Sequence, residues 1–440
     1  MLISIDYNKW QRLVAAISLS FLLIYCVEWN PDLYLKLFYG VGSKIYPWSD
    51  WVSVGSNGRL ATLLYWEANR VKVTKDLENI RAKNNNTYDL SMLRDGFKRV
   101  RLKRNVHLIV LESFFDPSLL SKIKFSRNPM HPNLFRHIGT KPAVSVSSVF
   151  GGRSANAEFE ILCGAPAFSD FSDIEFSIFG GKKTNCLPSL LSEIGYVTLA
   201  TNSYRPDFFN SEVAYKGLVF SEIYFPKEYS SLRNTYFSHG DVGEEKYMFD
   251  GDLLNQNVNF YSNRKKTSRD TPIFNYVVSN YGHFPYTIDY NKRPNIVDIE
   301  VPPEFDKEPI KRIVNQFYYR SQALGIYLDK LEKMDSEAVV VIVGDHLPTI
   351  EPVEKIKYGY KAYGILGYIG GIANAHRYSF LFIMCGGRKV SYDDVAQYNI
   401  LEIILDCLTD GEYCSKNKCF LPREHYHDRY LNIMAQAVER

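Results

Sequence analysis

A hydroxyl group at Ser154 stands where a nucleophile would be well placed to attack an anionic group. Ser154 follows Gly151, Gly152 and Arg153 and begins a run of Ala, Glu, Phe and Leu that predicts a helix. The backbone N–H groups and the dipole at a helix N-terminus favour an anion. A serine in this position caps a helix far more often than it catalyses a reaction, so the interpretation depends on other residues.

Acidic and imidazole groups follow three apolar segments that predict buried strands. The segments are residues 105–113, 272–279 and 338–346. Glu112 lies near the end of the first segment, and Asp345 and His346 are the last two residues of the third. His283 lies four residues after the end of segment 272–279. Active sites of open α/β sheets lie at the carboxyl ends of strands, so these groups are expected to share one edge of a sheet.

These stretches resemble the lipoteichoic-acid synthase and phosphoglycerol transferase branch of the alkaline phosphatase and sulfatase superfamily. The match covers roughly residues 100 to 410. In that branch the nucleophile is usually the Thr of a Gly-Lys-Thr-Ser-Asp-Ala-Glu motif, and residues 152–158 keep this frame with Ser154 in its place. Either hydroxyl can attack phosphorus, so the resemblance implies a covalent phospho-Ser154 intermediate.

The resemblance also implies one divalent metal, often manganese. Its ligands, matched by motif, would be Glu112, Ser154, Asp345 and His346. Two carboxylates, an imidazole and a hydroxyl suit Mn²⁺ first, then Zn²⁺ or Mg²⁺. The metal would stabilise the alkoxide, while His283 would bind the transferred phosphate or protonate the leaving alcohol.

Head-group recognition is the least complete part of the resemblance. The family's corresponding loop carries a His and later a Trp and an Arg that hold phosphoglycerol. This loop has no His, and Phe209 and Ser211 stand near the other two positions. Arg205 is a candidate for a displaced cation, and a surface salt bridge is an alternative of at least equal weight. His239 and Arg153 are further candidates for substrate binding; the alternatives are a solvent-exposed loop residue for His239 and a role in shaping or supporting the nucleophile loop for Arg153.

Each predicted role has a structural alternative. Glu112 could cap a helix or pair with Arg153. The adjacent Asp345 and His346 could be a satisfied polar pair at a strand end. His283, which precedes Phe-Pro, could be a turn residue.

Two related enzyme classes are disfavoured by the sequence. The segment nearest to the formylglycine signature of sulfatases is residues 186–190, but Leu190 stands where that signature requires Arg. A two-zinc phosphatase would need further Asp or His ligands, and none occurs at convincing spacing.

Strands alternate with helices along the chain, which predicts an α/β fold. We expect a mostly parallel central sheet with helices on both faces, similar to alkaline phosphatases and sulfatases. Residues 307–334 form a long amphipathic pattern and act as the crossover into the Asp345 strand. The other expected elements are helices near 60–83, 187–194 and 395–408 and strands at 196–201 and 378–385.

A candidate membrane helix precedes this domain. Residues 13–27 are apolar apart from two serines, and tryptophans bracket them at about the spacing of one bilayer crossing. Lys9 and Arg12 precede the run while Glu28 and Asp32 follow it, which predicts a cytoplasmic N-terminus with the remaining chain outside. With the family resemblance, this implies a single-pass protein of the bacterial inner membrane whose catalytic domain lies in the periplasm. A cleaved signal peptide and a buried N-terminal helix are the alternatives, but no small-x-small cleavage site follows the run.

The sequence therefore predicts four parts. They are a membrane anchor with a short cytoplasmic N-terminus (1–30), a juxtamembrane linker with helices (31–100), a sulfatase-like catalytic domain (101–412) and a C-terminal extension (413–440). With 46% hydrophobic and 23% charged residues, the 440-residue chain can build a sizeable core. A net charge of +3 gives no reason to expect nucleic acid as a partner.

The seven cysteines are too scattered to predict a disulfide scaffold or a zinc ribbon. Cys414 and Cys419 are close together in a polar loop and suit a small disulfide in an oxidising compartment. Cys163 and Cys385 are expected to be free thiols in the core.

These features together predict an enzyme that transfers a phosphoglycerol-type or phosphoethanolamine head group. The donor would be a phospholipid and the acceptor an envelope glycan. The main alternative is a metal-dependent phosphodiesterase, phosphatase or other sulfatase-fold hydrolase, in which water takes the second step. A non-catalytic envelope binding protein is a further alternative.

Overall fold

The computed structural model describes residues 9–438 in two compact units. The stretches outside the description are residues 47–49, 84–87, 121, 140–142, 230–233, 268–270, 304, 349, 351–376 and 393. One unit contains the chain up to Asn85 together with Ser169–Ile174, and the other contains Asn86–Phe168 and Glu175–Val438. The helices of the first unit are α1 (Lys9–Glu28), α2 (Pro31–Gly40), α3 (Asp50–Asn57) and α4 (Arg59–Lys83).

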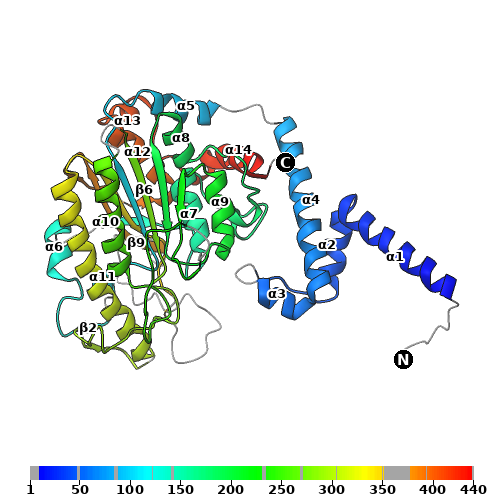
Figure 1. The fold of residues 1–440 in the computed structure, drawn as a ribbon, viewed down its shortest axis with the longest axis horizontal. Helices are drawn as coiled ribbons and strands as arrows, with labels where there is room; N and C mark the ends of the chain where they lie inside the picture. The colour runs from blue at the N-terminus through cyan, green and yellow to red at the C-terminus, as the bar shows by residue number, and fades with distance from the viewer. Residues whose placement is uncertain are drawn as a thin grey trace. The chain divides into compact units, whose positions relative to one another are not determined.

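The second unit is built on one mixed, mostly parallel sheet (Figure 1). Its strands, in spatial order, are β11 (Val395–Ala396), β3 (Ala143–Val146), β9 (Tyr378–Cys385), β8 (Val339–Gly344), β1 (Val106–Leu111), β6 (Ile273–Ser279), β4 (Val197–Asn202) and β5 (Glu222–Tyr224). The run from β8 to β5 is parallel, whereas β9 runs antiparallel to β8 and β3. A short strand, β10 (Arg388–Val390), pairs with β9, and β2 (Lys124–Phe125) pairs with β7 (Ile299–Glu300) apart from the sheet.

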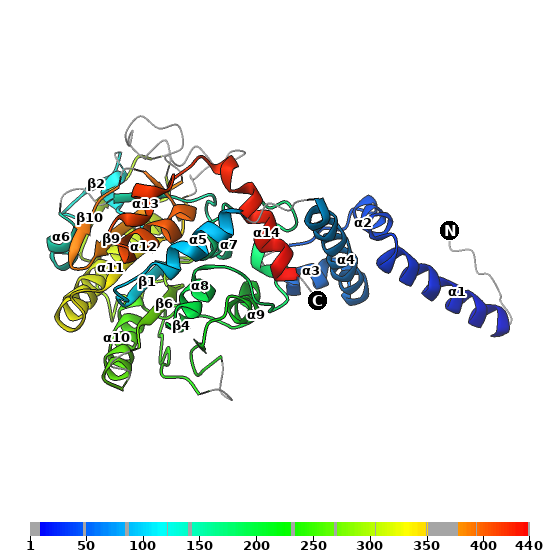
Figure 2. The ribbon, with the colours of Figure 1, turned by 90° about the horizontal axis from the view of Figure 1, so that it is seen from above.

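Helices cover both faces of this sheet (Figures 1 and 2). One face carries α6 (Pro132–Ile138), α10 (Asp250–Thr267) and α11 (Lys307–Met334). The other carries α7 (Ser154–Cys163), α8 (Leu187–Glu193) and α12 (Ile400–Leu408). Successive strand residues point to opposite faces, so Ile109 and Leu111 of β1 pack in the core beneath α10 and α11. The remaining helices are α5 (Tyr88–Lys98), α9 (Ser211–Gly217), α13 (Glu412–Lys416) and α14 (His427–Val438).

The predicted fold class is confirmed, and so are most of the predicted elements. The crossover helix α11 has the bounds expected from its apolar pattern, and the Asp306 side chain caps it by accepting a hydrogen bond from Glu308 N at 3.1 Å. The helix expected over residues 395–408 begins later than predicted. Residues 395–396 form an edge strand parallel to β3, and the covering helix begins only at Ile400.

The expectation of free thiols at Cys163 and Cys385 was wrong. Cys163 is bonded to Cys186, and Cys385 is bonded to Cys407. These partners are 23 and 22 residues apart in sequence, so only the packing of α7 against α8, and of α12 beside the sheet, brings them together.

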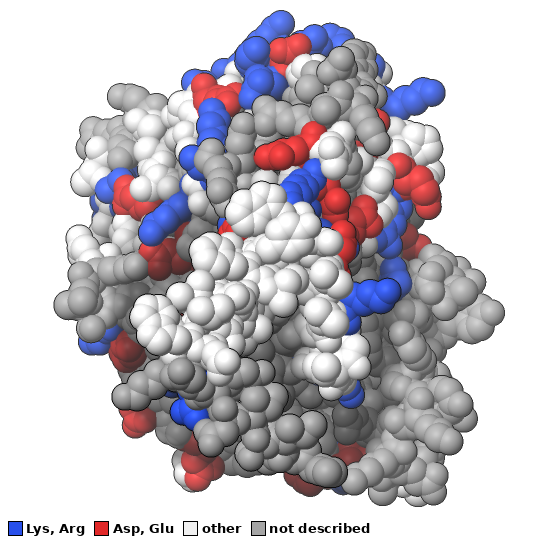
Figure 3. Space-filling view, turned by 90° about the vertical axis from the view of Figure 1, so that its right-hand side faces the viewer, with Lys and Arg blue, Asp and Glu red and all other residues white. Residues whose placement is uncertain are grey.

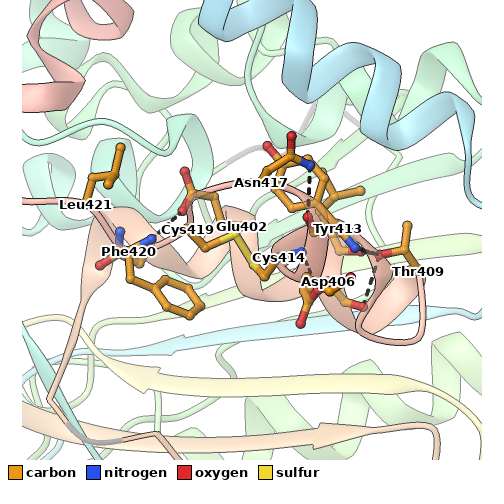
Figure 4. The surroundings of a disulfide bond; sticks show 12 residues. Glu402, Asp406, Thr409, Tyr413, Cys414, Asn417, Cys419, Phe420 and Leu421 are labelled. Atoms are coloured by element: carbon orange, nitrogen blue, oxygen red, sulfur yellow. Dashed lines mark hydrogen bonds between the residues drawn. A yellow bond between two sulfur atoms is a disulfide. The ribbon is translucent and has the colours of Figure 1, made fainter.

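The predicted Cys414–Cys419 disulfide is present (Figure 4). It closes a short loop beside α12, whose acidic side chains hold the loop at both ends. Cys414 N donates to Asp406 Oδ1 at 2.8 Å, and Phe420 N donates to Glu402 Oε2 at 3.1 Å.

The first unit contains the candidate membrane helix. Within the described residues, α1 is long and apolar enough to cross a bilayer by length and composition, and most of its apolar side chains are exposed. Figure 3, viewed from the α1 side of Figure 1, shows a broad surface that lacks charged side chains. The length and exposure of α1 are consistent with a single crossing, while its orientation stays a prediction.

A buried acid at the end of α11 leads to a prediction about stability. Burial alone would raise the pKa of Asp335, but hydrogen bonds from His107, Lys265 and Tyr261 outweigh it and hold that pKa below its ordinary value. We expect Asp335→Asn to lower the free energy of unfolding by about 3 kcal/mol at pH 7, because Lys265 loses its charged partner. A depressed folded-state pKa contributes stability that is lost as pH falls, so the difference from the unmodified protein should shrink below about pH 4.

Thermal unfolding of both proteins at pH 7 and at pH 3 measures this difference. Asp329→Asn is a suitable control, because Asp329 is a more exposed acid on the same helix that pairs with Arg136. An equal loss of stability at both pH values would contradict the proposed ionisation of Asp335.

Candidate active site

The register of the parallel strands brings the predicted acidic residues together. Glu112 directly follows β1, and Asp345 directly follows β8. Leu111 lies beside Gly344 in the pairing of these strands, so Glu112 and Asp345 emerge side by side. Leu111 also lies beside Ser279, the last residue of β6. The three strand ends therefore form one edge, as the sequence predicted.

Ser154, the first residue of α7, lies against these strand ends. Its Oγ is 3.0 Å from Glu112 Oε2 and 3.2 Å from His346 Nε2. Because Ser154 is the first residue of α7, its hydroxyl lies at the positive end of the helix dipole. The structure thus places the predicted nucleophile in direct contact with two of the predicted metal ligands.

The donor set fits a divalent metal. Glu112, Asp345 and His346 are buried, and each offers a ligand atom within 4.8 Å of the others. His346 Nε2 lies 3.5 Å from Glu112 Oε1 and 3.4 Å from Asp345 Oδ2. Carboxylate oxygens and an imidazole nitrogen are suitable for manganese, zinc or magnesium. The identity of the metal stays a prediction.

The electrostatics of the cluster also favour a cation. Burial, followed by the charge of Glu112, raises the pKa of Asp345 to about 6. Burial would also raise the pKa of Glu112, but the charges of His346 and His283 outweigh it and lower that pKa. Burial alone would lower the pKa of His346. The charges of Asp345 and Glu112 outweigh burial, so the pKa of His346 is raised. Two buried carboxylates side by side are costly unless positive charge lies between them, which a divalent ion would supply.

Neighbouring backbone groups orient the ligand atoms. His346 Nδ1 lies 2.9 Å from Leu347 O, which assigns the ring proton to Nδ1 and leaves the lone pair of Nε2 for a metal. Asp345 Oδ1 accepts hydrogen bonds from Ser113 N at 2.7 Å and from His346 N at 2.6 Å. Asp345 Oδ2 therefore remains available as a ligand.

Left-handed backbone conformations occur beside the candidate site residues. Positive φ angles occur at Ser113 (50°), Arg153 (64°), Phe209 (51°), Asn210 (58°) and Tyr286 (59°). Such angles are unfavourable for residues other than glycine and persist where the surrounding structure holds them in place. The loops next to Glu112, Ser154 and the His283 turn are therefore held in place by the structure around them.

His283 lies in the turn that follows β6. Its Nδ1 is 2.8 Å from Phe284 O and 3.1 Å from the hydroxyl of Tyr247. The preceding residue, Gly282, packs against Glu112 O, so the turn that carries His283 lies beside the cluster. The predicted role of His283 as an acid or a phosphate ligand remains a prediction.

The three other candidates lie outside the cluster. Arg153 is exposed and directly precedes Ser154. Arg205 is paired with Asp207 in its own loop, the arrangement named above as the structural alternative. His239 lies 3.9 Å from Glu228 and contacts the ring of Tyr229. Their roles in substrate binding stay predictions.

A small pocket beside Ser154 contains residues that the sequence did not assign to the site. Glu112, Ser154 and Asp345 line it together with Val110, Glu158, Asn202, Phe208, Phe209, Ser211, Val278, Ser279 and Asn280. The rule that identified Glu112 could have found Asn202 and Asn280, because they lie at the ends of β4 and β6. Phe209 and Ser211, which stand near the family's Trp and Arg positions, do line this pocket.

A buried arginine holds the backbone of Glu112 in place. Arg320 of α11 is paired with Asp250 and donates from Nη2 to Glu112 O at 2.8 Å. Gly282 packs tightly here, since a Cβ added to it would lie 2.1 Å from Glu112 O and 2.5 Å from Arg320 Nη1. The turn that carries His283 is thus packed directly against the backbone of Glu112.

This packing predicts a large effect of one methyl group. We expect Gly282→Ala to push Glu112 and His283 apart and to lower kcat/KM by about 100-fold, since misplacement by about 1 Å has effects of this size. Steady-state kinetics with thermal unfolding would measure the change. Gly55→Ala is the matched control, because nothing lies within 4 Å of a Cβ added there. Unchanged kcat/KM in a folded Gly282→Ala protein would contradict the described packing.

The fold and the donor cluster define the class of this protein as an α/β domain of the alkaline phosphatase type. The chain belongs to the sulfatase family, which matches residues 104–393. Its cluster contains Ser154 and no cysteine, and Cys186 of the segment nearest to the formylglycine signature is held in a disulfide.

Two solved structures share the fold. The lipoteichoic acid synthase LtaP from Listeria monocytogenes is 17% identical, with a TM-score of 0.56 over 73% of this chain and 77% of that one. The Streptococcus pyogenes phosphoglycerol transferase GacH, in complex with sn-glycerol-1-phosphate, is 15% identical, with a TM-score of 0.57 over 84% of this chain and 92% of that one.

A curated relative from Rhizobium meliloti, a putative cyclic beta-1,2-glucan modification protein, is 26% identical over 274 residues. The match covers 62% of this chain and 38% of that relative's length.

Proposed function

We propose that this chain is a membrane-anchored, metal-dependent transferase. It moves a phosphoglycerol-type or phosphoethanolamine head group from a phospholipid to an envelope glycan through a phospho-Ser154 intermediate. The contact of Ser154 Oγ with Glu112 and His346 at the N-terminus of α7 carries this proposal, because it joins a nucleophile, a metal-competent cluster and an anion-binding helix end.

The residues of the site have distinct tasks in this reaction. Glu112, Asp345, His346 and Ser154 Oγ would hold one divalent ion, which lowers the pKa of a bound hydroxyl and neutralises phosphoryl charge when it is present. Ser154 Oγ–H donates to Glu112 Oε2, so its proton has an acceptor as Oγ forms the bond to phosphorus.

His283 would then donate a proton to the departing diacylglycerol oxygen. In the second half-reaction the same imidazole would take a proton from the acceptor hydroxyl as its oxygen bonds to phosphorus, while the Ser154 Oγ–P bond breaks and Oγ regains a proton.

Three observations favour a transferase at the membrane over a soluble hydrolase. The apolar helix α1 would hold the site near lipid donors. The fold is shared with phosphoglycerol transferases, and a relative is described as a glucan modification protein. The three disulfides are consistent with an oxidising compartment such as the periplasm. The complete donor cluster supports an enzyme over a binding protein.

The full-length chain in lipid nanodiscs allows a direct test. Head-group-labelled phosphatidylglycerol or phosphatidylethanolamine is supplied with Mn²⁺, and release of diacylglycerol is measured with and without a glucan acceptor. We expect metal-dependent release that the acceptor accelerates, with the label moving to the glycan. Release with the label appearing only in free glycerol phosphate or phosphoethanolamine would instead identify a hydrolase.

A further inference from the structure

A connected set of aromatic rings extends from the candidate site toward solvent. We call it the aromatic row, and its members are His283, Tyr247, Tyr204, Tyr229, His239 and Phe208. Tyr204 lies at the centre, with ring centroids 5.5 Å from Tyr247, 5.6 Å from Tyr229 and 5.0 Å from Phe208. Tyr247 continues to His283 at 5.3 Å, and Tyr229 continues to His239 at 5.2 Å.

The aromatic row meets the pocket at two points. Phe208 lines the pocket beside Ser154, and Tyr204 N donates to the side chain of Asn202, which also lines it. At the other point the row ends at His283, and the residue before it, Gly282, packs against Glu112 O. A ligand that contacts Tyr204 and Tyr229 would therefore lie beside the pocket of the nucleophile.

The outer part of the aromatic row is open to solvent. Tyr247 is 6% exposed, but Tyr229 is 36% exposed, and Tyr204, Phe208 and His239 are partly exposed. Within the described part of the chain, the hydroxyls of Tyr204 and Tyr229 make no hydrogen bond. Contiguous exposed rings with available hydroxyls are typical of a recognition surface rather than of a core.

Charged groups of both signs surround the aromatic row. Arg205 pairs with Asp207, Glu228 accepts hydrogen bonds from Ser238 Oγ and His239 N, and Lys246 Nζ lies 5.2 Å from the ring centroid of Tyr247. These two cations and two anions balance, so the rings present apolar faces and phenol groups with little net charge. A pyranose ring has the complementary chemistry, with an apolar C–H face and hydroxyls at its edge.

We propose that the aromatic row binds a neutral sugar ring of the acceptor glycan and places its hydroxyl beside phospho-Ser154. This inference rests on the proposed function and adds the location and class of the acceptor. Tyr229 and Tyr204 would stack on the sugar and donate to its hydroxyls, while the lipid donor would enter the pocket without using them.

The two half-reactions separate this inference from the proposed function. In the full-length protein we expect Tyr229→Ala to lower kcat/KM for a β-1,2-glucan oligosaccharide about tenfold, the effect of one lost stacking contact. The rate of diacylglycerol release without acceptor should not change. Tyr229→Phe should show a smaller loss, and Tyr290→Ala, at an exposed tyrosine outside the row, should show none. Unchanged acceptor kinetics in Tyr229→Ala, or an equal loss in donor release, would overturn the inference.

Direct binding tests the aromatic row even if no head group is released. Calorimetric titration of the full-length protein with the same oligosaccharide should show binding that Tyr229→Ala weakens about tenfold and Tyr290→Ala leaves intact. Absence of binding to the unmodified protein, or equal binding by all three proteins, would overturn the inference. Absence of donor release together with intact binding would contradict only the proposed reaction.

Discussion

Replacement of Ser154 by alanine is expected to lower head-group release by at least about 10³-fold, because it removes the hydroxyl that contacts both Glu112 and His346 at the start of α7 and would form the covalent intermediate. The loss should appear in kcat, since Ser154 Oγ acts on the reacting phosphorus and adds little to binding of the lipid. Diacylglycerol release from labelled phosphatidylglycerol in nanodiscs, with Mn²⁺ present, measures it.

The matched variant for this experiment is Ser154→Thr. Threonine keeps the hydroxyl and is the usual nucleophile of the family that the motif resembles, so we expect Ser154→Thr to retain much of the activity. If Ser154→Ala kept a substantial part of kcat, the role of Ser154 would be that of a helix cap alone, the structural alternative for this residue.

Replacement of Glu112 by glutamine is expected to weaken metal binding at least about 100-fold. Glu112 contributes a carboxylate oxygen to the cluster, and changes to groups that only support metal ligands already have effects of up to about this size. Glutamine has nearly the same shape, so the loss can be assigned to charge and not to packing. Titration with Mn²⁺ followed by metal analysis of the dialysed protein gives the affinity and the stoichiometry.

Glu158→Gln is the matched control for the metal experiment. Glu158 lines the same pocket, one turn along α7 from Ser154, and accepts hydrogen bonds from Tyr215 and Tyr276. Burial raises the pKa of Glu158 to about 7, so this carboxyl already carries a proton part of the time near neutral pH. We expect Glu158→Gln to bind one Mn²⁺ with nearly unchanged affinity. Equal loss in both variants would contradict the assignment of Glu112 as a ligand.

The sequence was sufficient to predict the elements that carry the cluster. Apolar strands followed by Glu112 and by Asp345-His346 predicted both the sheet and the edge at which these groups meet, because the chain pattern fixes which end of a parallel strand bears the polar group. The bounds of α11 followed from its amphipathic period. These features depend on local residue patterns, which a sequence contains directly.

Other parts of the site depend on long-range packing and were not predicted. Tyr247 reaches His283 from a loop 36 residues earlier, and Arg320 reaches the backbone of Glu112 from 208 residues away. Nothing in the local sequence of either residue indicates these contacts. The Cys163–Cys186 disulfide is similar, since it follows from the packing of α7 beside α8 and not from a spacing motif.

The covalent step at Ser154 is the central claim of this account. The most direct measurement incubates the full-length protein with Mn²⁺ and head-group-labelled phosphatidylglycerol, quenches the reaction in acid and maps peptides by mass spectrometry. The account predicts a glycerol-phosphate adduct on the peptide containing Ser154 that is absent from Ser154→Ala. A protein that releases diacylglycerol with metal bound but carries no adduct on Ser154, after parallel trials with phosphatidylethanolamine, would contradict it.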